Sequence, residues 1–169
     1  MQSTQKKIRV LVVDDSLLAR KVIINGLSSR TNLEVVGYAI NAIDAQNKVN
    51  QLNPDVMVCD VQMPGMTGID FVKKLLPEHP LPVVLISSLS LGVFDTLHAG
   101  AIDFVRKPDG TQSMDIFVSA LAQKVEVAAH AKVRRPTVAV PASSAPALGS
   151  SAIGQTIIGL GASTGGTEA

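Results

Sequence analysis

The fold is decided by the stretch Val56-Met57-Val58-Cys59-Asp60 and by the segment that follows it, Val61-Gln62-Met63-Pro64-Gly65-Met66-Thr67-Gly68. A short apolar run bounded by turn residues is typical of a buried parallel strand. Its last residue, Asp60, then lies where the strand opens into a loop, the edge at which open α/β sheets carry their chemistry. An aspartate that only begins the turn explains this stretch equally well, so the remaining elements have to decide between the two.

The rest of this domain alternates short apolar runs with stretches in which apolar residues recur at helical spacing. The runs predict strands at residues 8–13, 33–39, 82–86 and 101–105, and the spacing predicts helices at 17–29, 41–52, 68–76, 92–98 and 113–131. Because the strands are apolar without alternation, we expect helices to cover both faces of the sheet. The sequence thus predicts an α/β fold, a flavodoxin-like doubly wound sheet of five parallel strands.

Composition divides the chain into three parts. Residues 1–131 carry the predicted strands and helices, and residues 132–155 are rich in Ala, Pro and Ser, which predicts a flexible linker. Residues 156–160 form a new apolar run that ends in the turn Gly161-Ala162-Ser163-Thr164-Gly165-Gly166. We expect residues 156–169 to begin a second α/β domain.

Charge and hydropathy exclude several classes of protein. The formal net charge is +1, which gives no electrostatic footprint for nucleic acid. No apolar run reaches the roughly 18 residues typical of a membrane span, and the polar stretch Met1–Lys7 leads into a strand rather than into a signal peptide. Cys59 is the only cysteine, so no disulfide forms within the chain. The sequence therefore predicts a cytoplasmic protein that neither binds nucleic acid nor inserts into a membrane.

Polar side chains stand at four of the predicted strand ends, and a parallel sheet brings these ends to one edge. They are Asp14 and Asp15, Asp60, Ser87 and Lys107. Clustered carboxylates repel one another unless a cation neutralises them, and hard oxygen ligands suit Mg²⁺. A carboxylate beside Mg²⁺ and a lysine is suited to accept a phosphoryl group. Each residue alone fits a structural role, as a helix-start acid, a loop serine or a solvated lysine, but together they favour phosphoryl transfer.

This set of residues resembles the receiver domains of bacterial two-component response regulators. The resemblance covers residues 8–131 and rests on Asp14-Asp15, on Asp60 with residues 63–68, on Ser87 and on Lys107-Pro108. It implies that Asp60 is the phosphoacceptor and that a histidine kinase supplies the phosphoryl group.

The resemblance also implies a magnesium site around the acceptor. Asp15, Asp60 and the backbone carbonyl of Gln62 would bind Mg²⁺, with Asp14 assisting. All of these ligands are oxygen atoms, which is the ligand type that Mg²⁺ prefers.

The fourth and fifth strands supply the remaining groups of the receiver pattern. Ser87 and Lys107 would hold the phosphoryl oxygens. Phe104 matches the position of the aromatic switch residue, although a core phenylalanine on the fifth strand fits equally well. The segment 87–107 is about one helical turn shorter than the family pattern, and we expect the shortfall to fall on the fourth helix, which belongs to the usual output face.

A second motif lies near the end of the sequence, where Gly161-Ala162-Ser163-Thr164-Gly165 fits the G-x-S-x-G nucleophile elbow after a predicted strand. Alone the pattern is common, and a Gly-rich turn explains it equally well. The segment does not match the dinucleotide-binding fingerprint, because Thr164 stands where its third glycine belongs. After a receiver and a linker, however, residues 158–169 resemble the chemotaxis protein-glutamate methylesterases, as do Ser87-Ser88-Leu89 and residues 100–105.

The second resemblance implies that Ser163 is the nucleophile of an esterase that receiver phosphorylation controls. Its substrates would be methyl-glutamate and glutamine side chains of methyl-accepting chemoreceptors. A serine nucleophile needs a general base and an orienting acid, and in this family both follow the serine. The only histidines, His79, His98 and His130, precede the linker. We therefore expect a methylesterase truncated just after its nucleophile, with no esterase activity of its own.

Three alternatives compete with the methylesterase interpretation. A stand-alone phosphoacceptor module without esterase activity fits the receiver residues equally well. A DNA-binding response regulator is disfavoured, because neither a recognition-helix pattern nor a basic patch follows the linker. A haloacid-type phosphatase is disfavoured because Gln62 stands where that chemistry needs a second aspartate.

Overall fold

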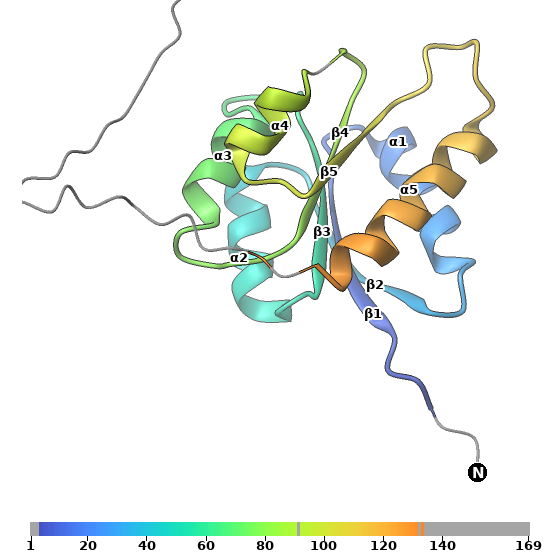
Figure 1. Cartoon of the computed structure of the whole chain (residues 1–169), viewed down its shortest axis with the longest axis horizontal. Helices are drawn as coiled ribbons and strands as arrows, with labels where there is room; N and C mark the ends of the chain where they lie inside the picture. The colour runs from blue at the N-terminus through green and yellow to red at the C-terminus, as the bar shows by residue number, and fades with distance from the viewer. Residues whose placement is uncertain (1–3, 91, 132, 134–169) are drawn as a thin grey trace, which may run out of the picture. The chain divides into compact units, whose positions relative to one another are not determined.

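A five-stranded parallel sheet runs through the residues that the computed structural model describes, which are 4–90, 92–131 and 133 (Figure 1). The strand order is β2-β1-β3-β4-β5. The strands are β1 Ile8–Val13, β2 Leu33–Ala39, β3 Val56–Asp60, β4 Val83–Ser87 and β5 Asp103–Arg106. The order changes direction between β1 and β3, so a switch point lies there and a crevice is expected beside it. The predicted flavodoxin-like fold is confirmed.

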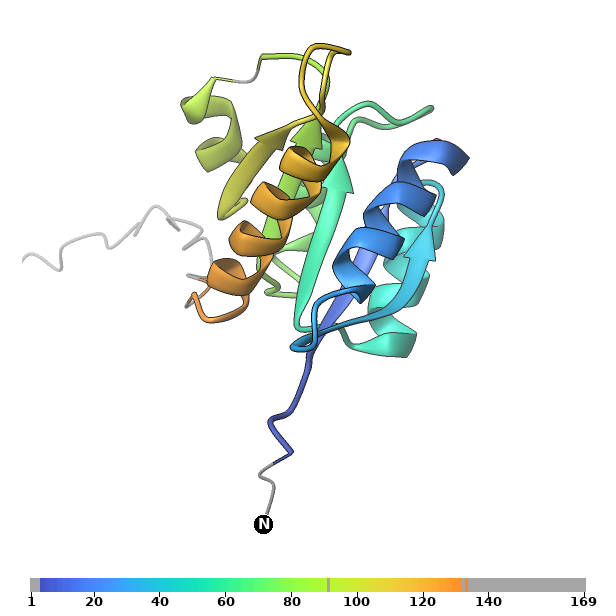
Figure 2. The same ribbon diagram turned by 90° about the vertical axis from the view of Figure 1, so that its right-hand side faces the viewer.

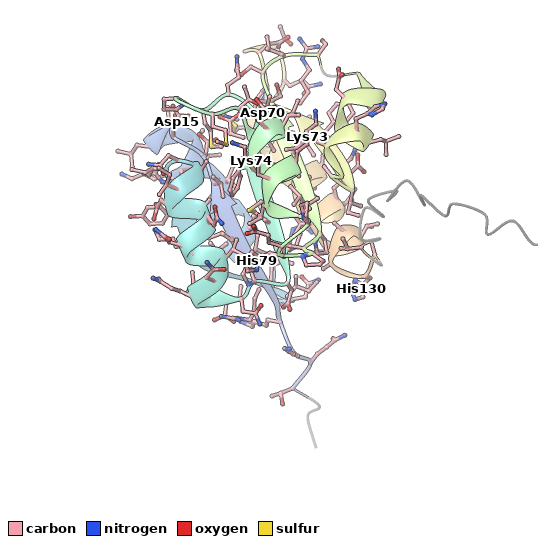
Figure 3. All side chains as sticks on the ribbon, turned by 90° about the vertical axis from the view of Figure 1, so that its left-hand side faces the viewer. Asp15, Asp70, Lys73, Lys74, His79 and His130 are labelled. Carbon is pink, nitrogen blue, oxygen red and sulfur yellow. The ribbon has the colours of Figure 1, made fainter. Side chains whose placement is uncertain are left out.

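Helices cover both faces of the sheet. They are α1 Leu17–Ser28, α2 Ala42–Leu52, α3 Gly68–Leu75, α4 Val93–Ala99 and α5 Met114–Ala129. Figure 2 shows α1 and α5 side by side over one face, and Figure 3 shows α2, α3 and α4 over the other. At seven residues α4 is the shortest of the five, as expected. Among the described helices, none is long and apolar enough to cross a membrane.

Alternate residues of each strand point into two separate cores. Leu11, Met57 and Leu85 pack under α2, α3 and α4, whereas Val12 and Val58 pack under α1 and α5. Because successive side chains of a strand point to opposite faces, a sheet buried on both sides needs apolar residues at every position. This explains why β3 reads as a continuous apolar run.

Side-chain caps account for most of the small differences between predicted and observed helix ends. Asn41 and Ser113 were expected to open helices, but each is the residue before the helix and accepts a hydrogen bond from a backbone N–H of the first turn. Ser16 caps α1 in the same way, by accepting a hydrogen bond from Ala19 N. The predicted linker and the predicted start of a second domain lie outside the described residues, Val133 excepted.

The Cys59 thiol, fully buried on β3, is expected to be chemically inert in the folded protein. Burial raises its pKa, and the negative charges of Asp60 and Asp14 raise it further, so little reactive thiolate forms. We expect thiol alkylation at neutral pH to be at least about 1,000-fold slower than in denaturant, because reaction requires unfolding. Mass spectrometry of the alkylated protein measures both rates, and fast labelling without denaturant would contradict the burial.

Candidate functional site

The carboxyl ends of four strands meet at one edge of the sheet and bring the predicted site residues together. Asp60 is the last residue of β3 and pairs with Ile86 of β4. Ser87, which follows Ile86, is the last residue of β4. Asp14 follows β1 directly, and Lys107 follows β5 directly. Asp15 lies at the same edge, above the sheet in Figure 3.

Three carboxylates form a compact cluster there. One oxygen from each of Asp14, Asp15 and Asp60 lies within 4.8 Å of the other two. Asp14 is 0% exposed and Asp60 is 3% exposed, whereas Asp15 is open to solvent. Two buried carboxylates this close are costly unless a cation neutralises them.

Lys107 supplies one such cation. Its Nζ lies 2.8 Å from Asp14 Oδ2 and donates a hydrogen bond of 2.9 Å to Asp60 Oδ2. Burial lowers the pKa of Lys107, but the two carboxylates raise it by more, so its pKa lies above the usual value and the ammonium persists. Burial likewise raises the pKa of Asp60, and Lys107 opposes that effect without cancelling it.

The cluster keeps capacity for a second cation. Asp14 Oδ1 accepts a hydrogen bond of 2.9 Å from Ser16 N. Asp14 Oδ2 lies 2.8 Å from the Lys107 ammonium, which also contacts Asp60 Oδ2 at 2.9 Å, so one ammonium is shared by two buried carboxylates. Among the described residues, three clustered carboxylates beside a single ammonium offer the oxygen ligands that fit a hard divalent cation such as Mg²⁺.

Gln62 and Ser87 contact the acceptor region differently from each other. Gln62 N donates to Asp60 Oδ1 at 3.1 Å, and the Gln62 side chain accepts from Ser88 Oγ at 3.0 Å. Ser87 is buried, and its Oγ accepts from Leu89 N at 3.0 Å. A hydroxyl that accepts a hydrogen bond still has its own hydrogen to donate. The predicted metal contact of the Gln62 carbonyl and the predicted phosphoryl contact of Ser87 remain predictions.

Phe104 lies at the margin of the core, which leaves both sequence interpretations open. It is partly buried and packs against the cluster under α3 and α4. The ammonium of Lys124 lies 5.7 Å from its ring, and Lys124 also donates to the Phe104 carbonyl at 3.0 Å. The switch role of Phe104 remains a prediction. Ser163, the predicted nucleophile, lies outside the described residues.

Arg20 also contacts the site, although it was not among the predicted site residues. It is only 8% exposed, and its Nη1 donates to the backbone carbonyl of Asp14 at 2.8 Å. A signal was present, because Arg20 shares one face of α1 with the buried residues Ile23 and Leu27. An arginine at a core position of a helix needs a buried acceptor.

Gly68 fixes the turn that follows the acceptor, and replacing it by alanine should disturb Asp60 itself. Gly68 N donates to Val61 O at 2.8 Å, and a Cβ on Gly68 would lie 2.1 Å from the Asp60 carbonyl oxygen. Because backbone cannot rotate away as a side chain can, we expect Gly68→Ala to lower the free energy of unfolding by at least about 2 kcal/mol. Urea denaturation measures this loss.

Gly65→Ala is the matched control in the same loop. Its φ of +85° disfavours a side chain, but nothing lies within 4 Å of the added Cβ. We expect a loss of roughly 1–2 kcal/mol from conformation alone. A smaller loss for Gly68→Ala than for Gly65→Ala would show that the turn tolerates a displaced Asp60 carbonyl.

Comparison with protein families and curated sequences gives the following matches. Residues 10–119 match the response regulator receiver domain family. The chain is 45% identical to protein-glutamate methylesterase/protein-glutamine glutaminase 2 of Syntrophomonas wolfei, over 97% of this chain and 48% of that protein. It is 43% identical to the protein-glutamate methylesterase/protein-glutamine glutaminase of Syntrophotalea carbinolica, over 97% of this chain and 50% of that protein. The chain thus spans about half the length of the curated relatives it matches.

Solved structures match the described domain. The response regulator domain of Thermotoga maritima CheB is 34% identical, with a TM-score of 0.69 over 75% of this chain and 99% of that one. A chain of the CheX–CheY–BeF3–Mg complex from Borrelia burgdorferi is 26% identical, with a TM-score of 0.61 over 72% of this chain and 90% of that one. Both likenesses extend over nearly all of the compared domain.

Proposed function

Because the chain belongs to the response regulator receiver domain family, we propose that Asp60 accepts a phosphoryl group and that this transfer is the signal the protein receives. The observation that carries the proposal is the contact of the Lys107 ammonium with the buried Asp60 carboxylate at 2.9 Å, beside two further carboxylates. A nucleophilic carboxylate held against a fixed positive charge suits acyl phosphate formation.

In the proposed reaction an Asp60 oxygen attacks phosphorus, and a new O–P bond replaces the bond to the donor's leaving group. With the phosphohistidine of a histidine kinase as donor, the P–N bond breaks and the leaving group is the imidazole of that histidine. The Lys107 ammonium offsets charge on the phosphoryl oxygens, and the Ser87 hydroxyl donates to one of them.

Magnesium would be held by Asp15, Asp60 and the Gln62 carbonyl, with Asp14 assisting. When bound it supplies positive charge next to the transferring group. The cluster of three carboxylates beside a single ammonium, within the described residues, supports this assignment, and so does the magnesium named for the Borrelia burgdorferi complex that contains a similar chain.

We further propose that this receiver regulates a methylesterase in which Ser163 is the nucleophile. The support is that similarity to the methylesterases covers 97% of the chain and so extends beyond the receiver domain. The matching relatives are named as protein-glutamate methylesterases and protein-glutamine glutaminases. Chemoreceptor glutamate esters would be the substrates, a chemotaxis histidine kinase the phosphodonor and the cytoplasm the location. The stand-alone module without esterase activity leaves the similarity of residues 132–169 unexplained.

Intact-mass spectrometry tests the proposed phosphorylation. The chain incubated with Mg²⁺ and acetyl phosphate should gain the mass of one phosphoryl group, and excess chelator added before the donor should prevent the gain. The same incubation without a phosphodonor is the control. No gain in the presence of Mg²⁺ would contradict the proposal.

Esterase activity is expected to be absent from the 169-residue chain itself. Its three histidines all precede residue 132, so no histidine follows Ser163 to act as its general base. Methanol release from methylated chemoreceptor membranes should stay at background for this chain and should not change with Ser163→Ala. Release that depends on Ser163 would mean that one of the three histidines serves as the base.

A further inference from the structure

The buried charge of Arg20 has no part in phosphoryl transfer as described above, yet it contacts the site. Its Nη1 donates 2.8 Å to the Asp14 carbonyl oxygen. That carbonyl belongs to the peptide unit that joins Asp14 to Asp15, two of the three clustered carboxylates. Arg20 therefore forms a hydrogen bond to the backbone between two candidate cation ligands.

Two further hydrogen bonds hold Asp14, one to β2 and one within its own loop. Asp14 N donates to Ala39 O at 3.1 Å, and Asp14 Oδ1 accepts from Ser16 N at 2.9 Å. These contacts fix the start of the Asp14–Asp15 segment. The Arg20 hydrogen bond fixes the carbonyl that follows, and with it the direction in which Asp15 leaves β1.

Tyr38, the residue before Ala39, holds the guanidinium in place. Its ring centroid lies 4.7 Å from Arg20 Cζ, within cation–π distance. Lys48 lies 4.9 Å from the same ring and donates to the Tyr38 carbonyl, so the ring also has a cationic neighbour on α2. The planar guanidinium can stack on an aromatic ring and donate in its own plane at the same time, which an ammonium cannot do.

We propose that Arg20 is a positioning residue for divalent-cation binding, and that it acts through the Asp14–Asp15 peptide while Tyr38 supports its guanidinium. The inference rests on the proposed magnesium site and adds the residue that orients its ligands. Groups that orient ligands from the second layer typically change metal affinity 10–100-fold when they are removed.

A purely electrostatic role and a positioning role of Arg20 predict opposite changes in cation affinity when Arg20 is removed. If Arg20 acted only as a positive charge near the cluster, removing it would tighten cation binding, because like charges repel. If Arg20 orients the Asp14–Asp15 peptide, removing it weakens binding. The sign of the change in affinity therefore separates the two.

The test is the Mg²⁺ dissociation constant of the 169-residue chain, measured by titration calorimetry with Mg²⁺ alone. We expect Arg20→Met to raise this constant about 10-fold or more. Arg30→Met is the matched control, since Arg30 donates to Ser119 on α5 and lies outside the site, and it should bind as the wild type does. An Arg20→Met constant within about twofold of the wild type, or a lower one, overturns the inference. A wild-type chain that binds no Mg²⁺ overturns the proposed site as well.

Variants of Tyr38 keep the test decisive if Arg20→Met fails to fold. Tyr38→Leu removes the ring under the guanidinium but leaves Arg20 in place, and Tyr38 is 46% exposed, so the fold should survive. We expect weaker Mg²⁺ binding in Tyr38→Leu and restored binding in Tyr38→Phe, which keeps the ring face. Equal affinity in both Tyr38 variants overturns the supporting role of the ring and, with it, the inference.

Discussion

Asp60→Asn protein should gain no phosphoryl group from acetyl phosphate under conditions that label the wild type fully. Asparagine matches the shape of aspartate and can still accept the hydrogen bond from Lys107, but its amide oxygen is not a nucleophile. Burial raises the pKa of Asp60 and so disfavours its charge, hence a neutral side chain of the same shape should fit the site. We therefore expect loss of labelling without loss of folding, measured by intact mass and by a thermal unfolding scan.

Asp115→Asn is the matched control for this experiment. Asp115 is an exposed aspartate in the first turn of α5 and is not one of the three clustered carboxylates. It should be labelled as fully as the wild type. If Asp60→Asn gained as much mass as Asp115→Asn, the phosphoacceptor would be another residue and the proposed function would fail.

Lys107→Met should destabilise the domain more than any surface change. Lys107 is 16% exposed and is the only side chain, among the described residues, paired with both Asp14 and Asp60. Removing one partner of a buried ion pair leaves uncompensated charge, which typically costs about 3–5 kcal/mol. We expect a loss of about that size at neutral pH in urea unfolding, and Mg²⁺ should recover part of it by replacing the missing positive charge.

The pH dependence of this loss has a definite sign. Burial raises the folded-state pKa of Asp60, and without the opposing ammonium it should rise further. A carboxyl group whose folded pKa lies above its unfolded pKa destabilises the fold when ionised, and this penalty disappears as pH falls through the folded pKa. The difference between Lys107→Met and the wild type should therefore shrink on acidification.

Arg106→Met is the control for Lys107→Met. Arg106 precedes Lys107 and pairs with Asp109 at 3.7 Å, with both side chains about half exposed. Exposed pairs contribute little, about 0–1 kcal/mol. Equal losses for the two variants, or a Lys107→Met loss that Mg²⁺ does not reduce, would show that Lys107 is not the counter-ion of the buried carboxylates.

Local pattern was enough to predict the fold and the ends of the strands that carry the site. Asp60 and Ser87 close apolar runs, so their position at one edge followed from strand geometry alone. The fifth strand was less accurate, predicted at residues 101–105 and observed at Asp103–Arg106. Ala101 N donates to Thr96 O, so this residue closes the end of α4 rather than opening the strand.

Contacts between residues far apart in sequence were not predictable from spacing. That Lys107 bridges Asp14 and Asp60 depends on the packing of three strands. The pairing of Arg20 with Tyr38 depends on α1 crossing β2, and a single arginine within an amphipathic helix usually faces solvent. Helical periodicity places Arg20 on a face, but only the folded chain shows what it touches.

The ring of Tyr38 also gives the protein an intrinsic fluorescent probe close to the site. The sequence contains one tyrosine and no tryptophan, so all tyrosine emission from the chain comes from this ring. The ring lies against the guanidinium that bonds to the Asp14 carbonyl. A rearrangement of the loop after β1 therefore changes the surroundings of a single fluorophore, and the occupancy of the acidic edge can be followed in real time without attaching a label.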